Sequence, residues 1–248
     1  MKVIAIIPSR YESKRFPGKA LADIKGKTMI QRVYEQTQKS DLIDGVYVAT
    51  DSEAIQKSIQ EMGGNVVMTS ENCRSGTDRV AEAARTLELG KDDVIVNIQG
   101  DQPLLPPECL NDLVQPFFTN PGLTMATLAH TLRDENEIND PNNVKVIIDG
   151  DHFAIYFSRA RIPFNRDDTK TVQYLKHIGI YAYSNSFLQE FTNLPHSTLE
   201  HIEKLEQLRV IESGNKIRVT VTDHDSPSVD DPADIKKILP LLQTVSET

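Results

Sequence analysis

The first half of this chain alternates short apolar runs with amphipathic stretches, and this alternation limits the possible folds more than any other feature. The apolar runs have the length of buried strands, and they cover residues 2–8, 46–50, 66–69 and 94–99. The stretches between and after them have helical periodicity, over 29–39, 53–62, 78–89 and 107–118. Such alternation over short links predicts an α/β fold, with a mainly parallel sheet flanked by helices on both faces.

The pattern changes after about residue 122, where β-rich segments cover 124–131, 144–149, 153–157 and 177–183. Asp149-Gly150-Asp151 is a hairpin-type turn signal. We therefore expect an added antiparallel, β-rich region, with a protruding segment around 159–176 of the kind that forms subunit interfaces. The last expected elements are a helix or helix pair, a strand and a closing helix, over 197–214, 216–222 and 231–242.

Length and composition narrow the class of protein. A chain of 248 residues fits one domain, which we divide into halves 1–122 and 123–248. A net charge of −9 argues against a nucleic-acid partner. No apolar run approaches the roughly 20 residues that cross a bilayer, so neither membrane insertion nor a secretory leader is expected. Two cysteines, Cys73 and Cys109, suit a reducing cytoplasm.

A basic loop follows the first expected strand. It carries Arg10, Lys14, Arg15 and Lys19, four cations that repel one another unless an anion lies among them. Arginine offers a bidentate fork to phosphate oxygens and lysine a mobile point charge. The loop therefore predicts a polyphosphate site, with a solvated charged loop as the alternative. A P-loop motif is absent, because Ala20 follows Lys19, and the loop also lacks the G-x-G-x-x-G motif of dinucleotide-binding sites. Pro17 and Gly18 are expected to turn the backbone so that Lys19 points back toward the end of the strand.

Acidic residues near this edge predict a metal site. Asp101 follows the strand that ends at Gln99, and a magnesium ion commonly uses one or two carboxylates beside substrate phosphates. Alone, Asp101 would be a turn former. Asp231 before Pro232 fits a helix N-cap and Asp234 the first helical turn, which leaves Asp230 as the second expected ligand.

Two further groups of polar residues have possible ligand roles. Ser75 opens an expected helix and Gln99 ends a strand, so the pair suits a nucleobase edge, although capping by Thr77 explains the same pattern. In the second half, the combination of residue types suits a carboxylated, polyhydroxylated substrate. The residues concerned are Arg159, His177, Tyr181 and Gln207. Helix 199–209 places Ile202, Leu205 and Leu208 on an expected core stripe, and its other face is equally explained by solvation.

These motifs together resemble the CMP-KDO synthetase family, the 3-deoxy-manno-octulosonate cytidylyltransferases. The matching segments run in order along nearly the whole chain, at 7–11, 15–19, 49–51, 75–79, 96–103, 156–163, 177–181, 199–209 and 229–234. The pattern Leu-Glu-x-x-Glu-x-Leu-Glu-Gln-Leu-Arg at 199–209 distinguishes this family from the related CMP-sialate synthetases.

The resemblance implies a nucleotide-diphospho-sugar transferase fold, a homodimer, magnesium dependence, and conversion of CTP and KDO to CMP-KDO and pyrophosphate for lipopolysaccharide synthesis. It makes 1–122 the nucleotide-binding half and 123–248 the half for sugar-acid binding and dimerisation. The implied roles are triphosphate binding by Arg10, Arg15 and Lys19, cytidine contact by Ser75 and Gln99, metal binding by Asp101 and Asp230, and sugar-acid binding by Arg159, His177, Tyr181 and Gln207.

Three positions depart from the family pattern, namely Gln102, Phe164 and Asp231. They leave an 8-amino-3,8-dideoxy sugar acid as an alternative substrate.

The expected catalysis needs no covalent nucleophile: Lys19, Arg15 and Asp101 stabilise charge during phosphoryl transfer. Two other classes remain open, a metal-dependent glycosyltransferase, which usually carries an Asp-x-Asp signature, and a non-catalytic nucleotide sensor.

Overall fold

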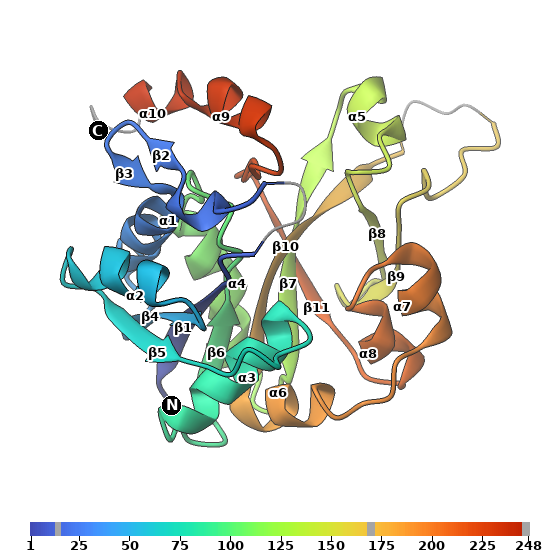
Figure 1. Cartoon of the computed structure of the whole chain (residues 1–248). Coiled ribbons are helices and arrows are strands. Elements are labelled where there is room, and N and C mark those ends of the chain that lie inside the picture. The colour runs from blue at the N-terminus through green and yellow to red at the C-terminus, as the bar shows by residue number, and fades with distance from the viewer. Residues whose placement is uncertain (13–15, 168–171, 245–248) are drawn as a thin grey trace.

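The computed structural model describes residues 1–12, 16–167 and 172–244, and within them a nine-stranded sheet forms the centre (Figure 1). The main path of neighbouring strands is β11 (Arg218–Thr222), β7 (Met125–Leu132), β10 (Tyr174–Ser184), β6 (Val94–Asn97), β1 (Val3–Ser9), β4 (Gly45–Thr50) and β5 (Asn65–Met68). β10 pairs antiparallel with both neighbours, and all other pairs on this path are parallel. The sheet is therefore mainly parallel in direction, as the sequence predicts.

The remaining strands form two antiparallel groups, one attached to the main sheet and one separate from it. β8 (Lys145–Ile148) pairs with β10, and β9 (Ala154–Ser158) pairs with β8. A separate hairpin joins β2 (Asp23–Ile24) to β3 (Lys27–Thr28). The expected antiparallel region is thus present in the second half of the chain.

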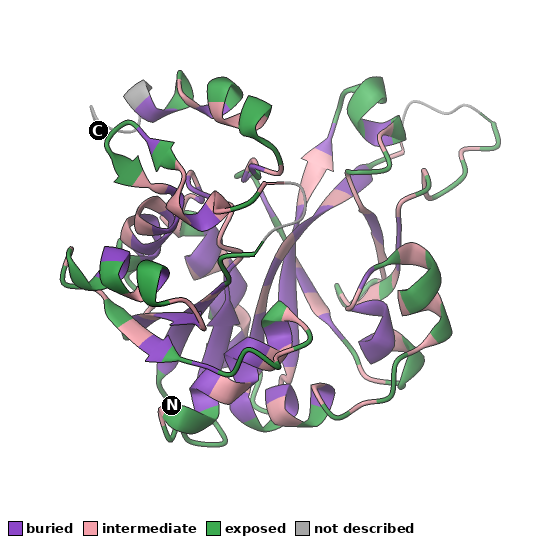
Figure 2. Cartoon of the chain, viewed as in Figure 1, coloured by how far each residue is buried: buried purple, intermediate pink, exposed green. Residues whose placement is uncertain are grey.

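Helices cover both faces of the sheet, and its central strands are buried (Figure 2). Side chains of β1 alternate between the two cores that these helices cover. Val3, Ala5 and Ile7 join the core beneath α1 (Met29–Gln38), α2 (Glu53–Gln60) and α4 (Pro107–Thr119). Ile4 and Ile6 join the core beneath α3 (Gly76–Thr86), α6 (Asn185–Phe191) and α8 (Leu208–Glu212). Burial on both faces explains why β1 reads as a continuous apolar run rather than an alternating one.

The remaining helices are short. They are the 3₁₀ helix η1 (Lys19–Leu21), α5 (Glu135–Asn139), α7 (Thr198–Glu203), α9 (Pro232–Ile238) and α10 (Leu241–Thr244). α9 and α10 lie beside the β2–β3 hairpin (Figure 1), where Ile238 and Leu242 join a third core with Ile24 and Met29. The backbone N–H of Val229, just before α9, donates to the carbonyl of Asp101 at 2.9 Å, which brings the end of the chain to the carboxyl edge of the sheet.

The predicted elements occur in the predicted order, but several local expectations were wrong. The region 197–214 forms a helix pair, one of the two predicted alternatives, because Lys204 adopts a left-handed conformation (φ 56°) and ends α7. Ile202 is therefore 69% exposed instead of lying on the core stripe, whereas Leu205 and Leu208 are buried. The closing helix is also divided, with Leu239 and Pro240 separating α9 from α10.

Two differences concern the antiparallel region. β10 begins at Tyr174, inside the expected protrusion 159–176, of which 168–171 lie outside the described residues. Helices α5 and α6 were not predicted at all. Among the described residues, no helix has the length and apolar character that a membrane span requires.

Candidate functional site

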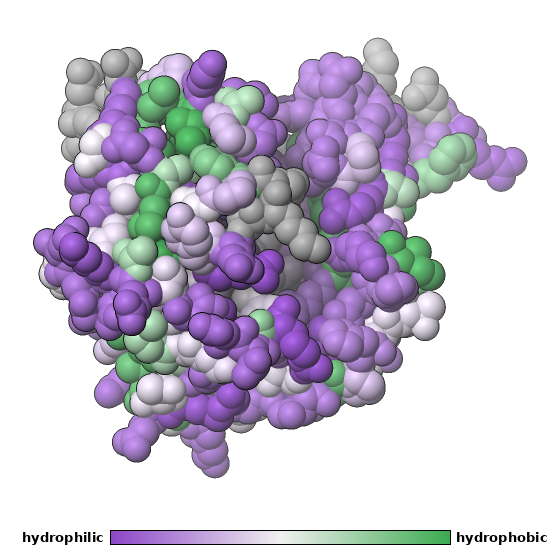
Figure 3. Space-filling model, in the orientation of Figure 1, coloured by the Kyte–Doolittle hydropathy of each residue, from purple (hydrophilic) through white to green (hydrophobic). Residues whose placement is uncertain are grey.

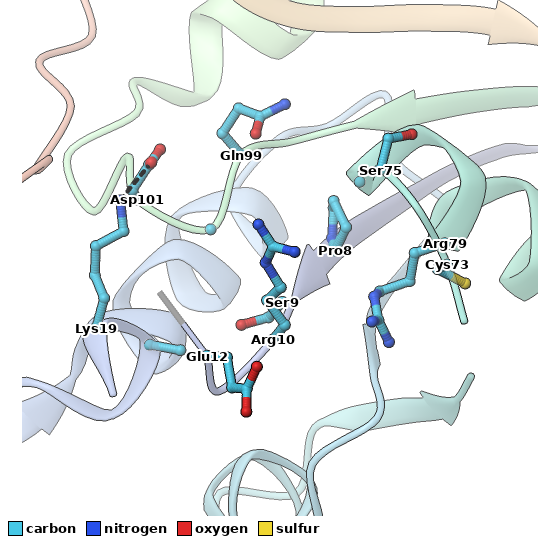
Figure 4. Close-up of a pocket in the computed structure, with 13 residues that line it drawn as sticks. Pro8, Ser9, Arg10, Glu12, Lys19, Cys73, Ser75, Arg79, Gln99 and Asp101 are labelled. Atoms are coloured by element: carbon cyan, nitrogen blue, oxygen red, sulfur yellow. Dashed lines mark hydrogen bonds and ion pairs between the residues drawn. The ribbon is translucent and has the colours of Figure 1, made fainter. Parts of the chain in front are cut away.

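A cavity of about 370 Å³ opens at the carboxyl ends of β1 and β6 (Figure 4). Parallel strands end at the same edge of a sheet, and this edge is where open α/β sheets bind ligands. The structure brings together five residues predicted for the site, Arg10, Lys19, Ser75, Gln99 and Asp101, all of which line the cavity. Arg15, predicted to bind phosphate and to take part in catalysis, lies outside the described residues.

Lys19 is positioned by the turn that Pro17 and Gly18 were expected to form. Gly18 has φ 70°, a left-handed conformation that glycine adopts without strain, and its N–H donates to the carbonyl of Tyr11 at 3.2 Å. The ammonium of Lys19 donates to Oδ2 of Asp101 at 2.7 Å and to the carbonyl of Val229 at 2.9 Å. The side chain of Lys19 thus points back to the carboxyl edge of the sheet, where Asp101 follows β6.

Two carboxylates flank this ammonium. Oδ1 of Asp230 lies 4.0 Å from Nζ of Lys19, so Asp101 and Asp230 share one cation although they are far apart in the sequence. The neighbouring acids have structural roles: Asp231 caps α9 by accepting from the N–H of Ala233 at 2.8 Å, and Asp234 completes a capping box. The two assignments of Asp231 and Asp234 are confirmed.

This pair of carboxylates fits a magnesium ion. The two carboxylates already surround one positive charge, the ammonium of Lys19, and carboxylate oxygens are the hard ligands that magnesium prefers. In the described part of the chain, no group of three or more His, Cys, Asp or Glu side chains is arranged to hold a metal. Magnesium tolerates such a sparse site, because it retains waters and takes further ligands from substrate phosphates.

The N-terminus of α3 forms another wall of the cavity. Ser75 is the N-cap, and its hydroxyl accepts from the N–H of Asp78 at 3.1 Å, so the expectation that Thr77 caps the helix was wrong. A Cβ on Gly76 would lie 3.4 Å from Cγ of Pro8, which shows how closely α3 approaches the end of β1. This separation is an ordinary van der Waals contact, so the N-terminus of α3 packs directly beside the end of β1.

Arg79, which was not predicted as a site residue, joins α3 to two strand ends. Its guanidinium donates to Oδ2 of Asp51 and to the hydroxyl of Thr69, each at 2.5 Å. Arg79 is 4% exposed and also borders a second cavity of about 640 Å³ next to the first. Its position in the segment 75–79 marks it as part of a motif, but no local pattern indicates its partners.

Glu82 holds the same loop one turn further along α3. Its carboxylate accepts from the N–H of Ser70 at 2.7 Å and from the thiol of Cys73 at 3.1 Å. Burial, together with the hydrogen bond to this carboxylate, raises the pKa of Cys73 to about 11. The thiol is therefore protonated at neutral pH and acts as a hydrogen-bond donor in the cavity wall.

His177 and Tyr181 lie on one face of β10, as predicted, with ring centroids 5.5 Å apart. Nε2 of His177 pairs with the hydroxyl of Thr127 at 3.0 Å. Burial lowers the pKa of His177 to about 3, so the imidazole is neutral at physiological pH. Burial likewise raises the pKa of Tyr181, which keeps its phenol protonated. Both side chains are consequently suited to hydrogen bonding with uncharged hydroxyl groups.

The turn before α8 connects these residues to the nucleotide side of the molecule. Glu206 accepts a hydrogen bond of 2.6 Å from the hydroxyl of Thr77, and burial raises the pKa of its carboxyl group. The adjacent Gln207 is 3% exposed, and within the described residues its Nε2 atom has no hydrogen-bond partner. A buried amide without a partner is a candidate ligand-binding group.

Arg159, the fourth residue predicted for sugar-acid binding, has its own set of hydrogen-bond partners. Its Nε donates to the carbonyl of Glu203 at 2.9 Å, and one terminal nitrogen donates to the carbonyl of Pro141 at 3.0 Å. The carboxylate of Glu203 accepts from the Arg159 N–H at 3.0 Å. The structure thus fixes Arg159 on the loop after β9, through partners that sequence reasoning did not identify.

The outer surface around the site is polar. Figure 3 shows a predominantly hydrophilic face that is hollowed between the part of the molecule carrying α2 and the part carrying α7. The cavity at the carboxyl ends of β1 and β6 lies in the first of these parts, and the residues on β10 and before α8 belong to the second half of the chain. Fold and cavity together define an α/β protein with a polar cavity, lined by Arg10 and Lys19, at its sheet edge.

The chain belongs to the cytidylyltransferase family, whose model matches residues 4–217. It is 52% identical over 243 residues to a 3-deoxy-manno-octulosonate cytidylyltransferase of Desulfatibacillum aliphaticivorans, covering 98% of this chain and 99% of the relative. It is 49% identical over 238 residues to an 8-amino-3,8-dideoxy-manno-octulosonate cytidylyltransferase of Shewanella frigidimarina, covering 96% and 97%. The resemblance seen in the sequence motifs is thereby confirmed.

Solved structures agree with this assignment. CMP:2-keto-3-deoxy-manno-octonic acid synthetase in complex with CTP superposes with a TM-score of 0.92 at 39% identity, covering 98% of this chain and 99% of that one. The fold alone is shared with 4-diphosphocytidyl-2C-methyl-D-erythritol synthase, at a TM-score of 0.64 and 16% identity, over 97% and 98% of the two chains. The predicted fold class is therefore confirmed.

Proposed function

We propose that this protein transfers the cytidylyl group of CTP to 3-deoxy-D-manno-octulosonate (KDO), giving CMP-KDO and pyrophosphate for lipopolysaccharide synthesis. The observation that carries the proposal is the cavity at the carboxyl edge of the sheet, where Arg10, Lys19 and Asp101 converge. Support comes from relatives about half identical over nearly the full length that are named for this reaction. A CTP complex of a structural relative adds to that support.

The first half of the chain would bind the nucleotide. Arg10 and Lys19, with Arg15, would hold the triphosphate oxygens, while Ser75 and Gln99 would contact the cytidine. Asp101 and Asp230 would hold a magnesium ion, which when bound neutralises charge on the departing pyrophosphate. These side chains position the α-phosphorus so that the reaction proceeds by in-line displacement rather than through a covalent intermediate with the protein.

In this displacement, the anomeric hydroxyl oxygen of the sugar acid forms a bond to the α-phosphorus, and the bond from that phosphorus to the bridging oxygen breaks. The electron pair leaves with pyrophosphate, and the hydroxyl proton passes to solvent. Lys19 and Arg15 would stabilise the negative charge that develops. Asp101 would act through the metal.

The second half would bind the sugar acid. Neutral His177, protonated Tyr181 and the Nε2 donor of Gln207, which has no partner among the described residues, suit sugar hydroxyls, and Arg159 suits the carboxylate. An 8-amino sugar acid is a second candidate substrate, because a relative named for it is 49% identical to this chain, close to the 52% of a KDO relative.

The test is pyrophosphate release from CTP and magnesium with KDO, with the 8-amino-3,8-dideoxy analogue and with sialic acid in parallel. Faster release with KDO supports the main proposal, and preference for the amino sugar moves the specificity while keeping the reaction. Folded, CTP-binding protein that releases no pyrophosphate with any of the three acids would refute an enzymatic role and favour a nucleotide sensor.

Asp101→Asn tests the metal role. We expect kcat to fall by at least about 100-fold, because an electrostatic group that acts mainly on the transition state contributes on this scale. Asp92→Asn, at an exposed position, is the matched control and should leave kcat unchanged. Near-normal turnover of a folded Asp101→Asn protein would contradict the assignment.

We further propose a homodimer formed by the second half. Large apolar side chains are exposed on β9, on α7 and in the loop after β9: Ile155 is 54% exposed, Ile202 69% and Phe164 87%. The double variant Phe164→Ser/Ile202→Ser should shift the protein to monomer in sedimentation velocity. Met68→Ser, at an exposed apolar residue on β5, should not. A wild-type protein that sediments as a monomer at micromolar concentration would refute the dimer.

We also propose that the reaction takes place in the cytoplasm. Cys73 and Cys109 are both free thiols, which suits a reducing compartment.

A further inference from the structure

Lys19 makes contacts that conflict with the role proposed for it in phosphate binding. Its ammonium lies 2.7 Å from Oδ2 of Asp101 and 4.0 Å from Oδ1 of Asp230, and it also donates to the carbonyl of Val229 at 2.9 Å (Figure 4 shows the Asp101 contact). A lysine ammonium has three protons to donate. Two of them already serve Asp101 and Val229, so in this position at most one remains for a triphosphate.

The electrostatic reason for this arrangement is the pair of acids. Two carboxylates that flank one position repel each other, and a cation between them removes the cost. The side chains concerned are only partly accessible, at 19% for Lys19, 24% for Asp101 and 44% for Asp230, so water screens their interaction incompletely. The ammonium of Lys19 therefore lies at a position where the carboxylates of Asp101 and Asp230 would otherwise attract a free cation.

We propose that Lys19 is an exchangeable counter-ion. Without nucleotide its ammonium occupies the cation position between Asp101 and Asp230, and a divalent cation arriving with the nucleotide displaces it toward the phosphates. This inference rests on the proposed magnesium-dependent function. The exchange makes binding of the divalent ion and binding of the triphosphate cooperative. The ion displaces the Lys19 ammonium from the two carboxylates, and the ammonium then binds the phosphates.

The local structure suits such an exchange. Lysine carries a compact charge on a flexible four-carbon stem, whereas an arginine fork is committed to fixed bidentate geometry. Lys19 begins the 3₁₀ helix η1, and its backbone N–H is fixed by a 3.1 Å hydrogen bond to the carbonyl of Phe16. The backbone thus stays anchored while the side chain changes partner.

The first measurement is the affinity of nucleotide-free protein for Mn²⁺, used as a spin-active substitute for Mg²⁺ and followed by the EPR signal of the free ion. Lys19→Met removes the ammonium and keeps the length of the side chain. We expect it to bind Mn²⁺ at least about tenfold more tightly than wild type, since a competing charge has been removed. Adding Asp101→Asn to this variant should abolish the gain.

Arg10→Met is the matched control, because Arg10 lines the same cavity and also carries one positive charge. A general loss of positive charge would raise Mn²⁺ affinity similarly in both variants, whereas displacement of a specific occupant raises it mainly in Lys19→Met. Thermal unfolding gives a second measurement. Millimolar Mg²⁺ should raise the Tm of Lys19→Met more than that of wild type, because the ion restores the missing charge between the acids.

The proposal is overturned if Lys19→Met binds Mn²⁺ as wild type does, or if Arg10→Met gains as much. Mn²⁺ binding by the wild-type protein in the presence of CTP distinguishes failure of the counter-ion role from failure of the proposed metal site. If it binds Mn²⁺ through Asp101 while nucleotide-free Lys19→Met shows no gain, only the counter-ion role fails. If Asp101→Asn leaves metal binding with CTP unchanged, the proposed metal site itself is wrong.

Discussion

Arg79 provides a sharp test of how the nucleotide side of the site is built. Arg79→Met removes a guanidinium whose side chain is 5% exposed and leaves Asp51, 17% exposed, without its ion-pair partner. Breaking a buried ion pair in this way costs about 3–5 kcal/mol, and the partial access of water to Asp51 favours the lower end, about 3 kcal/mol. For a chain of this size, that loss corresponds to a fall in Tm of about 6–12 °C.

The measurement is urea unfolding together with a thermal scan. Arg74→Met is the matched control, since Arg74 is 70% exposed and forms only a 3.4 Å ion pair with Asp78 within the same segment. It should change the free energy of unfolding by less than about 0.5 kcal/mol. Arg79 also fixes Thr69, at the start of the loop that carries Cys73, so the apparent affinity for CTP should fall in Arg79→Met alone.

A double-mutant cycle with Asp51→Asn isolates the pair. The double variant should be less destabilised than the sum of the two single variants, with a coupling of at least about 1 kcal/mol. A coupling near zero, or equal losses in Arg79→Met and Arg74→Met, would refute the reasoning that this buried pair joins α3 to the ends of β4 and β5.

Two further predictions concern stability. Burial lowers the pKa of His177 to about 3, so below pH 6.5 the unfolded chain takes up a proton that the folded chain does not, and stability should fall by about 1.4 kcal/mol per pH unit between pH 6 and 4. Urea unfolding across this pH range should show a smaller fall in the free energy of unfolding for His177→Asn than for wild type. The same slope of stability against pH in both proteins would contradict the prediction. Gly18→Ala should cost about 1 kcal/mol because φ is 70°, whereas Gly150→Ala, where nothing lies near an added Cβ, should cost much less. Equal thermal shifts in the two glycine variants would argue against strain at Gly18.

Much of the fold and part of the site could be predicted from the sequence, because the signals are local. Buried parallel strands read as apolar runs, and the polar residues that follow them must lie at one edge of the sheet. This reasoning predicts that Arg10, Gln99 and Asp101 lie together, and the cavity contains all three. Local signals also located the turn at Gly18 and the cap at Asp231.

Where local signals compete, the predictions were less accurate. Helical periodicity continues through 199–209, but Lys204 takes a left-handed conformation that lets Leu205 and Leu208 reach the core while Ile202 stays exposed. Tertiary packing decided this break, since the burial of two leucines outweighs the continuation of a short helix. The expected cap at Thr77 was wrong for a similar reason, because Thr77 instead donates to the distant Glu206.

The sequence by itself determined the class of fold, the edge of the sheet that carries the ligand site and the types of side chain available there. The tertiary structure decided which of those side chains meet. Lys19 contacts a carbonyl 210 residues away, and Thr77 contacts Glu206 across 129 residues. Such contacts depend on how the last segments of the chain return to the sheet. Periodicity and turn signals extend over only a few residues, whereas the pairing of distant charges follows from packing of the whole molecule.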